Sequence, residues 1–185
     1  MAKLFFNYST MNAGKSTILL QAAHNYEERG MVPYLLTAEI DNRSGEGKIA
    51  SRIGIEKRAD TFNDRLNLYN LLKSKQKSSP IACVLIDEAQ FLTKEQVWQL
   101  ARAVDDLFLP VLCYGLRVDF QGNLFPGSSA LLGLADELKE IKTICHCGKK
   151  ATMVVRKSAN NKPIKDGSQI PVSYTHLTLP TKRIV

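Results

Sequence analysis

The sequence predicts an α/β fold in which a parallel sheet is flanked by helices and followed by a small β appendage. Short apolar runs alternate with segments of helical periodicity, which is the pattern of a sheet whose faces are covered by helices. The runs expected to form strands are residues 4–8, 32–37, 81–86 and 110–115. A strand, a helix and a second strand in succession form a right-handed βαβ unit, so we expect parallel strands.

The helices are expected from their end signals and apolar spacing. Their positions are residues 15–29, closed by Gly30; residues 64–77, capped near Asn63 or Asp64; a helix that a Thr93–Gln96 capping box opens and that ends near Leu107; and residues 128–139. Trp98 shares a stripe with Leu100 and Val104, so we expect it in the core. Residues 38–51 are expected to be a loop, and residues 140–144 a strand.

A phosphate-binding loop (P-loop) is indicated by residues 9–17, between the first strand and the first helix. The stretch ends in Gly-Lys-Ser, in the strand–loop–helix order that this motif requires, which argues against a chance match. Loop amides and a helix N-terminus favour an anion. Lys15 can reach the outer phosphates of a nucleotide, and Ser16 can place its hydroxyl on Mg²⁺. Ser9 replaces the first glycine of the motif, so it must adopt an ordinary backbone conformation.

Two carboxylates follow the third strand. Asp87 is placed as the residue that faces Mg²⁺ together with Ser16. Glu88 could accept a proton from a substrate hydroxyl in a kinase or orient water in a hydrolase; a solvated or helix-capping carboxylate is the remaining alternative. Ligands of open α/β sheets bind beyond the carboxyl ends of the strands, where these residues, the P-loop and the loop at residues 116–127 are expected to meet.

Three basic residues in or next to the loop at residues 38–51 are candidates for phosphate contacts. They are Arg43, Lys48 and Arg52. Solvated loop charges explain the same residues equally well, so the sequence leaves both interpretations open.

The four cysteines fall into two groups. Cys83 and Cys113 lie inside apolar runs and are expected to be buried core residues. Cys145-His146-Cys147-Gly148 has two close thiols before a glycine, which is one half of a structural zinc knuckle. A tetrahedral site needs four ligands, and only His176 follows among the remaining His and Cys residues.

Composition and charge narrow the class of protein. Apolar residues make up 44% of the 185 residues, as in a soluble globular protein, and no run of about 18 apolar residues predicts a membrane span. No signal-peptide pattern precedes the first strand, so we expect a cytoplasmic protein that does not bind membranes. The net charge is +7, but basic and acidic residues balance up to Gly148, which argues against a nucleic-acid-binding groove.

Four segments together resemble one family. They are residues 9–17, 87–92, 114–120 and 145–148. In this order and spacing they are similar to the type II (cytosolic, zinc-containing) thymidine kinases, and to the bacterial branch in particular, which also has Ser at the position of Ser9. The resemblance covers about residues 1–170.

The resemblance implies transfer of a phosphoryl group from ATP to the 5′-hydroxyl of thymidine or deoxyuridine in nucleotide salvage. Glu88 matches the general base, and structural zinc is implied at Cys145 and Cys147. ATP and Mg²⁺ would bind at Ser9, Thr10, Met11, Asn12, Ala13, Gly14, Lys15, Ser16, Asp87, Glu88, Ala89 and Gln90, with Ser16 and Asp87 on the metal. The nucleoside would lie near Phe91, Leu116, Arg117, Asp119 and Phe120, with Arg52 as a transition-state cation. Members of the family are homotetramers inhibited by thymidine triphosphate.

The chain departs from the family after Ile170. The family continues into a glycine-rich lasso over the nucleoside and a second zinc-ligand pair, whereas residues 171–185 contain no glycine or cysteine. We therefore expect a nucleotide-binding domain at residues 1–143, a partial zinc-knuckle and lasso domain at residues 144–170, and a non-native tail at residues 171–185. If the tail is native, the alternative function is an ATP-binding protein that no longer phosphorylates nucleosides.

Overall fold

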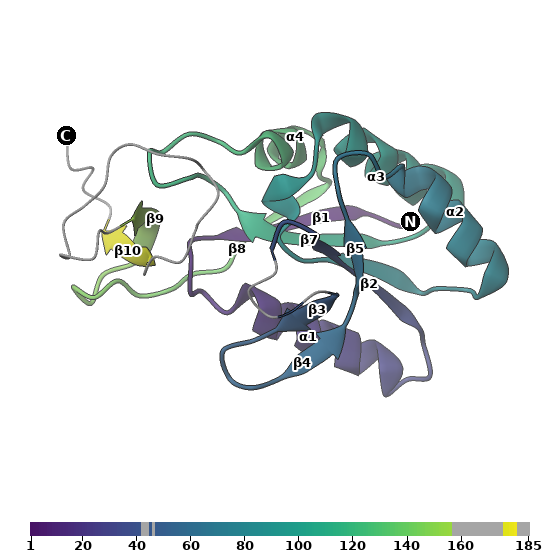
Figure 1. Cartoon of the computed structure of the whole chain (residues 1–185), viewed down its shortest axis with the longest axis horizontal. Coiled ribbons are helices and arrows are strands. Elements are labelled where there is room, and N and C mark those ends of the chain that lie inside the picture. Colours follow the sequence, from purple (N-terminus) through teal and green to yellow (C-terminus); the bar gives the residue numbers. More distant parts are fainter. Residues whose placement is uncertain (42–44, 46, 157–175, 181–185) are drawn as a thin grey trace.

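The computed structural model describes residues 1–41, 45, 47–156 and 176–180, and it confirms the predicted fold class. In this part of the chain, a parallel sheet of six strands runs in the order β5-β2-β6-β7-β1-β8 (Figure 1). Its strands are β1 (Leu4–Ser9), β2 (Pro33–Ala38), β5 (Asp60–Phe62), β6 (Cys83–Ile86), β7 (Val111–Leu116) and β8 (Glu137–Glu140). The helices are α1 (Lys15–Glu27), α2 (Leu68–Ser78), α3 (Lys94–Leu107) and α4 (Pro126–Leu134), with one 3₁₀ turn, η1 (Ala89–Phe91).

The sheet is buried on both faces because its apolar runs are unbroken. In β2, Tyr34 and Leu36 pack against the side that carries α2 and α3, whereas Leu35 packs against Leu19 and Leu20 of α1. Successive side chains of a strand point to opposite faces, so each apolar strand contributes side chains to the hydrophobic clusters on both faces of the sheet. Figure 1 shows the result, with α1 on one face of the sheet and α2, α3 and α4 on the other.

The predicted capping box of α3 is confirmed, but the prediction that Trp98 lies in the core is wrong. Thr93 accepts a hydrogen bond from the Gln96 amide at 3.1 Å, and the Gln96 side chain accepts one from the Thr93 amide at 3.1 Å. The buried stripe of α3 runs through Val97, Leu100 and Val104, and Trp98 is 52% exposed. One position is about 100° on a helix, which turns Trp98 out of the stripe.

The predicted start of α2 is also corrected. The helix begins at Leu68, because the Asn67 side chain accepts from the Asn70 amide and the Gln99 side chain accepts from the Leu68 amide. These bonds satisfy amides that lack partners inside the helix. Asn63 instead closes a local turn by accepting from the Arg65 amide.

The last helix and strand of the sheet lie earlier than predicted. Pro126 occupies the first turn of α4, a position that suits its fixed φ and missing N–H, and the helix ends at Leu134. The Leu4 amide then donates to the Asp136 carboxylate at 2.7 Å, while the Asp136 amide donates to the Leu4 carbonyl at 2.9 Å. This pair joins the chain to β1, so β8 forms at once and residues 141–144 lie outside it.

Among the described residues, two small antiparallel pairs lie outside the main sheet. The predicted loop at residues 38–51 contains β3 (Lys48–Ala50), which pairs with β4 (Glu56–Arg58) around a turn where Gly54 has φ +86°. β9 (Ala151–Arg156) pairs with β10 (His176–Pro180) beyond the edge at which the sheet strands end (Figure 1). None of the described helices is both long and apolar enough to cross a membrane.

Candidate active site

The P-loop connects β1 to α1 as the sequence predicts. Asn12 and Gly14 take positive φ values of 61° and 79°, whereas Ser9 does not, so the expectation of an ordinary Ser9 conformation is confirmed. The Ser9 hydroxyl instead donates to the Ile141 carbonyl at 2.6 Å. The first turn of α1 begins directly after Gly14, which leaves its unpaired amides facing the loop.

Lys15 is held inside this loop. Its side chain is buried, and its ammonium group donates to the Thr10 carbonyl at 2.9 Å. A buried ammonium group needs such an oxygen partner, and a phosphate oxygen is a stronger one. The loop therefore presents a cation and several amides to the same small volume.

Ser16 and Asp87 meet across the site. The Ser16 hydroxyl donates to Asp87 Oδ2 at 2.8 Å, although they lie on α1 and after β6. Burial, followed by the nearby Glu88 carboxylate, raises the pKa of Asp87 to about 7, while the Ser16 hydrogen bond acts in the opposite direction. Because burial and a neighbouring negative charge disfavour the ionised carboxylate, a nearby cation would stabilise it strongly. A hydroxyl and a carboxylate are also oxygen ligands that suit Mg²⁺.

Glu88 is held by an unusual backbone conformation and by contacts that include Asp87 and Gln90. It has φ +52°, a left-handed conformation uncommon for a glutamate, and is 9% exposed. Its amide donates to Asp87 Oδ1 at 3.0 Å. Gln90 Nε2 donates to Glu88 Oε2 at 2.5 Å, and Gln90 Oε1 accepts from the Leu116 amide at 3.0 Å. Strained residues of this kind persist where the surroundings hold them, and functional sites are where they gather.

A cavity of about 390 Å³ opens over these groups. The P-loop, Asp87 and Glu88 line it, together with Lys48 and Arg52 from β3 and the turn that follows. Its size falls in the range of small-molecule sites. Arg52, which is expected near the phosphates, thus lines the same cavity as the P-loop. Arg43 lies outside the described residues.

An apolar cluster adjoins the P-loop through Met11. Its buried members are Met11, Leu116, Phe125 and Val154, with Phe91 packed against them. The rings of Phe91 and Phe125 meet edge to face at 6.0 Å. The family resemblance implies that Phe91 and Leu116 lie near the nucleoside, which stays a prediction. The structure groups them with Phe125 and Val154, which lie in no motif.

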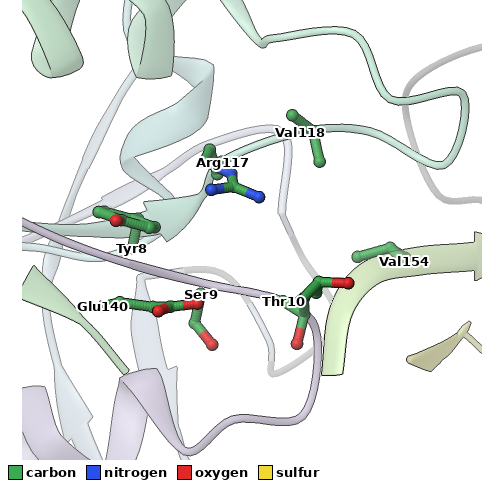
Figure 2. A pocket seen from close by; sticks show the side chains of 8 residues that line it. Tyr8, Ser9, Thr10, Arg117, Val118, Glu140 and Val154 are labelled. Carbon is green, nitrogen blue, oxygen red and sulfur yellow. The ribbon is translucent and has the colours of Figure 1, made fainter. Parts of the chain in front are cut away.

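A small hollow continues from this cluster along the end of β1. Figure 2 shows Arg117 and Val118 above Ser9 and Thr10, with Tyr8 and Glu140 to the left and Val154 to the right. The Arg117 guanidinium lies 5.7 Å from the centre of the Tyr8 ring. The hollow has room for about one water (10 Å³), so its walls are already close together.

Asp119 and Phe120 lie on the same loop but face different partners. Asp119 is 2% exposed, and its Oδ1 accepts from the backbone amides of Gln121 and Asn123 at 2.9 and 2.8 Å. This carboxylate therefore shapes the loop after β7. The Phe120 ring lies 5.6 Å from the Arg156 guanidinium of β9.

The described residues do not complete the predicted zinc site. Cys145 is buried and Cys147 exposed, and Cys145 Sγ lies 3.2 Å from His146 Nδ1. Within residues 1–41, 45 and 47–156, no three His, Cys, Asp or Glu residues are grouped to hold a metal ion. Two thiolates alone do not meet the four-ligand requirement of structural zinc. The side chain of His176 lies outside the described residues.

The sheet, the P-loop and the strand-end carboxylates have the arrangement of a P-loop nucleotide-binding protein. The family model for thymidine kinase matches residues 2–174. Thymidine kinase from Jannaschia sp. (strain CCS1) is 63% identical over 172 residues, covering 93% of this chain and 88% of the relative. That from Ruegeria pomeroyi is 63% identical over 184 residues, covering 98% and 93%. That from Rhizobium meliloti is 58% identical over 174 residues, covering 93% and 89%. The chain belongs to the thymidine kinase family.

Proposed function

We propose that this chain is an ATP-dependent thymidine kinase of nucleotide salvage. It transfers the γ-phosphoryl group of ATP to the 5′-hydroxyl of thymidine or deoxyuridine. The observation that carries the proposal is the position of Glu88, which lines the phosphate-side cavity and is joined through Gln90 to Leu116 of the apolar cluster. A base between a phosphate site and an apolar site suits a phosphoryl transfer to a nucleoside.

The phosphate side binds and aligns ATP. The P-loop amides and Lys15 hold the phosphates, replacing the bond that Lys15 makes to the Thr10 carbonyl. Ser16 and Asp87 would hold Mg²⁺, which neutralises phosphate charge when bound. Arg52 lines the same cavity, where it stabilises the charge of the transferring group.

Glu88 takes the proton of the nucleoside hydroxyl. The hydroxyl oxygen forms a bond to the γ-phosphorus, the bond from that phosphorus to the ADP oxygen breaks, and the proton passes to the Glu88 carboxylate. The hydrogen bond from Gln90 keeps the Glu88 carboxylate in one orientation. This orientation matters because positioning provides much of the catalysis in phosphoryl transfer.

The apolar cluster binds the nucleoside. Met11, Leu116 and Phe91 offer a surface for the base, and Phe120 stacks near it. Arg117 lies at the rim of this surface against Tyr8. Asp119 contributes by holding the loop through the Gln121 and Asn123 amides.

Three further properties belong to the same proposal. Family membership supports a cytoplasmic homotetramer that responds to the end product, and the charge balance up to Gly148 supports a protein that does not bind nucleic acid. A structural zinc at Cys145 and Cys147 would need ligands beyond the described residues. No step of the transfer passes through zinc.

The identity of the acceptor group is tested with 5′-deoxythymidine, which lacks only the proposed acceptor hydroxyl. With ATP and Mg²⁺, we expect a phosphorylated product from thymidine and from deoxyuridine, and none from the 5′-deoxy analogue. Equal ADP release with thymidine and with the analogue would contradict the proposal, because the acceptor would then be water or the 3′-hydroxyl and not the 5′-hydroxyl.

A further inference from the structure

Gln90 contacts Glu88, the proposed general base, and is almost completely buried. Its side chain is 1% exposed and connects two elements. Nε2 donates to Glu88 Oε2 at 2.5 Å, and Oε1 accepts from the Leu116 amide at 3.0 Å. The side-chain amide of Gln90 therefore donates one hydrogen bond to the Glu88 carboxylate and accepts one from the backbone at the end of β7.

The neighbouring backbone leaves room for this side chain. A Cβ on Gly115 of β7 would lie 2.9 Å from Gln90 Oε1 and 3.0 Å from the Gln90 amide nitrogen. A Cβ on Gly127 of α4 would lie 2.6 to 2.9 Å from the carbonyl oxygens of Ala89, Gln90 and Leu92. Such distances are too short for a real side chain, so β7 and α4 both approach η1 where a glycine allows it.

Glu88, the proposed general base, keeps its observed backbone conformation only with the help of contacts to its neighbours. Glu88 is in the left-handed region, which a glutamate adopts only where surrounding contacts hold it. The bond of its amide to Asp87 and the bond of its carboxylate to Gln90 contribute to this support. The second acts directly on the carboxylate orientation.

We infer that Gln90 is a positioning residue for the transfer. It turns the Glu88 carboxylate toward the acceptor hydroxyl and ties that orientation to the Leu116 backbone of the nucleoside side, while touching neither ATP nor nucleoside. This inference rests on the proposed function. It differs from the expectation that Gln90 binds the cofactor, since both polar ends of its side chain already have protein partners.

Two substitutions test the role. Gln90→Met has a similar volume and no hydrogen bonds, and Gln90→Asn keeps the amide but is one methylene too short to bridge Glu88 and Leu116. We expect kcat to fall about 10- to 100-fold in both, with KM for ATP and for thymidine within about twofold, because positioning acts on the chemical step. The Asn variant decides the question if the Met variant does not fold.

Gln96 provides a matched control. It is also 1% exposed, and its amide donates to the backbone carbonyls of Asn63 and Leu66, far from the P-loop in sequence and outside the cavity. We expect Gln96→Met and Gln96→Asn to lower the melting temperature at unchanged kcat. A similar loss of kcat in the Gln96 variants would overturn the inference, because a general loss of stability would then explain both.

A double-mutant cycle with Glu88→Gln identifies the partner through which Gln90 acts. We expect Gln90→Met to cause less than a threefold further loss of kcat once Glu88 is replaced. A further loss as large as in the wild type would show that Gln90 acts independently of the base and overturn the inference. Wild-type chain without thymidine-dependent ADP release would instead contradict the proposed function itself.

Discussion

The Ser16 hydroxyl and the Asp87 carboxylate lie 2.8 Å apart, although 71 positions separate them in the chain. Ser16 is in the first turn of α1, and Asp87 directly follows β6. The parallel order of the sheet brings these two ends to one edge. The pair lies between the P-loop and Glu88, the proposed general base.

Replacing either member of this pair is expected to impair catalysis more than stability. In Ser16→Ala and Asp87→Asn, we expect kcat/KM for Mg-ATP to fall at least about 100-fold, because the first removes an oxygen ligand and the second removes the negative charge that attracts the cation. Ser129→Ala, which removes an exposed hydroxyl from α4, is the control and is expected to retain activity. Steady-state ADP release at several Mg²⁺ concentrations measures the effect, and unchanged Mg²⁺ dependence in both variants would contradict it.

Two glycines of α4 are expected to respond oppositely to alanine. Gly127→Ala would press a Cβ against three carbonyl oxygens near η1, at 2.6 to 2.9 Å, so we expect a loss of about 2 kcal/mol or more in the free energy of unfolding. Gly133→Ala meets no atom within 4 Å and should gain about 0.5–1 kcal/mol from helix propensity. Urea unfolding measures both. Equal effects would mean that α4 does not press on η1 as described.

The fold could be predicted from sequence wherever one pattern dominated. Unbroken apolar runs gave the positions of β2, β6 and β7, and the Thr93–Gln96 capping box located α3. The misplaced boundaries depended on distant partners. Gln99 of α3 accepts from the first amide of α2, and Asp136 pairs with Leu4 at the start of β8. Such contacts carry no local signal, since their two halves lie more than 30 positions apart.

The edge of the sheet provides a test of pH dependence. Asp60 of β5 accepts from the Tyr34 hydroxyl at 2.6 Å and from Lys75 at 3.1 Å, and these bonds hold its pKa below the usual value of 3.8. A lowered carboxyl pKa adds stability above the unfolded-state pKa, and this stability is lost as the pH falls through the folded-state value.

We therefore expect Asp60→Asn to cost about 0.5 kcal/mol at pH 7, a small value because the side chain is 55% exposed. The difference from wild type should shrink as the pH falls below about 4. Denaturant unfolding between pH 3 and pH 7 measures it, with exposed Asp64→Asn as the control. A difference that grows toward acid would contradict the assignment of these bonds.

The cysteines are expected to differ in reactivity. The Lys149 backbone amide lowers the pKa of exposed Cys147, whereas burial raises the pKa of Cys83 to about 11. With chelator at pH 7.5, iodoacetamide should modify Cys147 first and Cys83 only after unfolding. Mass spectrometry of peptides follows both sites.

The same assay tests the metal site. We expect equimolar zinc to slow alkylation of Cys147 less than about twofold, since the described residues supply two thiolates and not four ligands. Strong protection would mean that residues outside the described ranges complete the site. The expected non-native tail, residues 171–185, then becomes the place to search.

The chemistry of the site was more predictable than its support. Lys15, Ser16 and Asp87 occur in motifs whose spacing predicts their roles, and the structure brings all three to one cavity. The contact of Gln90 with Glu88 and the close approach of Gly127 to the Ala89, Gln90 and Leu92 carbonyls could not be predicted from sequence. Asp119 is expected on the nucleoside side, which stays a prediction, and its carboxylate accepts from the Gln121 and Asn123 amides of its own loop, a contact that motif spacing does not reveal. Side-chain direction after a strand depends on packing, which spacing does not encode.

The central claim is that Glu88 is the base for transfer to a nucleoside hydroxyl. The most direct measurement is ADP release from Mg-ATP with and without thymidine, in the wild type and in Glu88→Gln, which keeps size and hydrogen bonding but cannot accept the proton. We predict stimulation by thymidine in the wild type and a loss of at least about 100-fold of that stimulated rate in Glu88→Gln, with ATP binding retained. Full stimulation in Glu88→Gln would contradict the account.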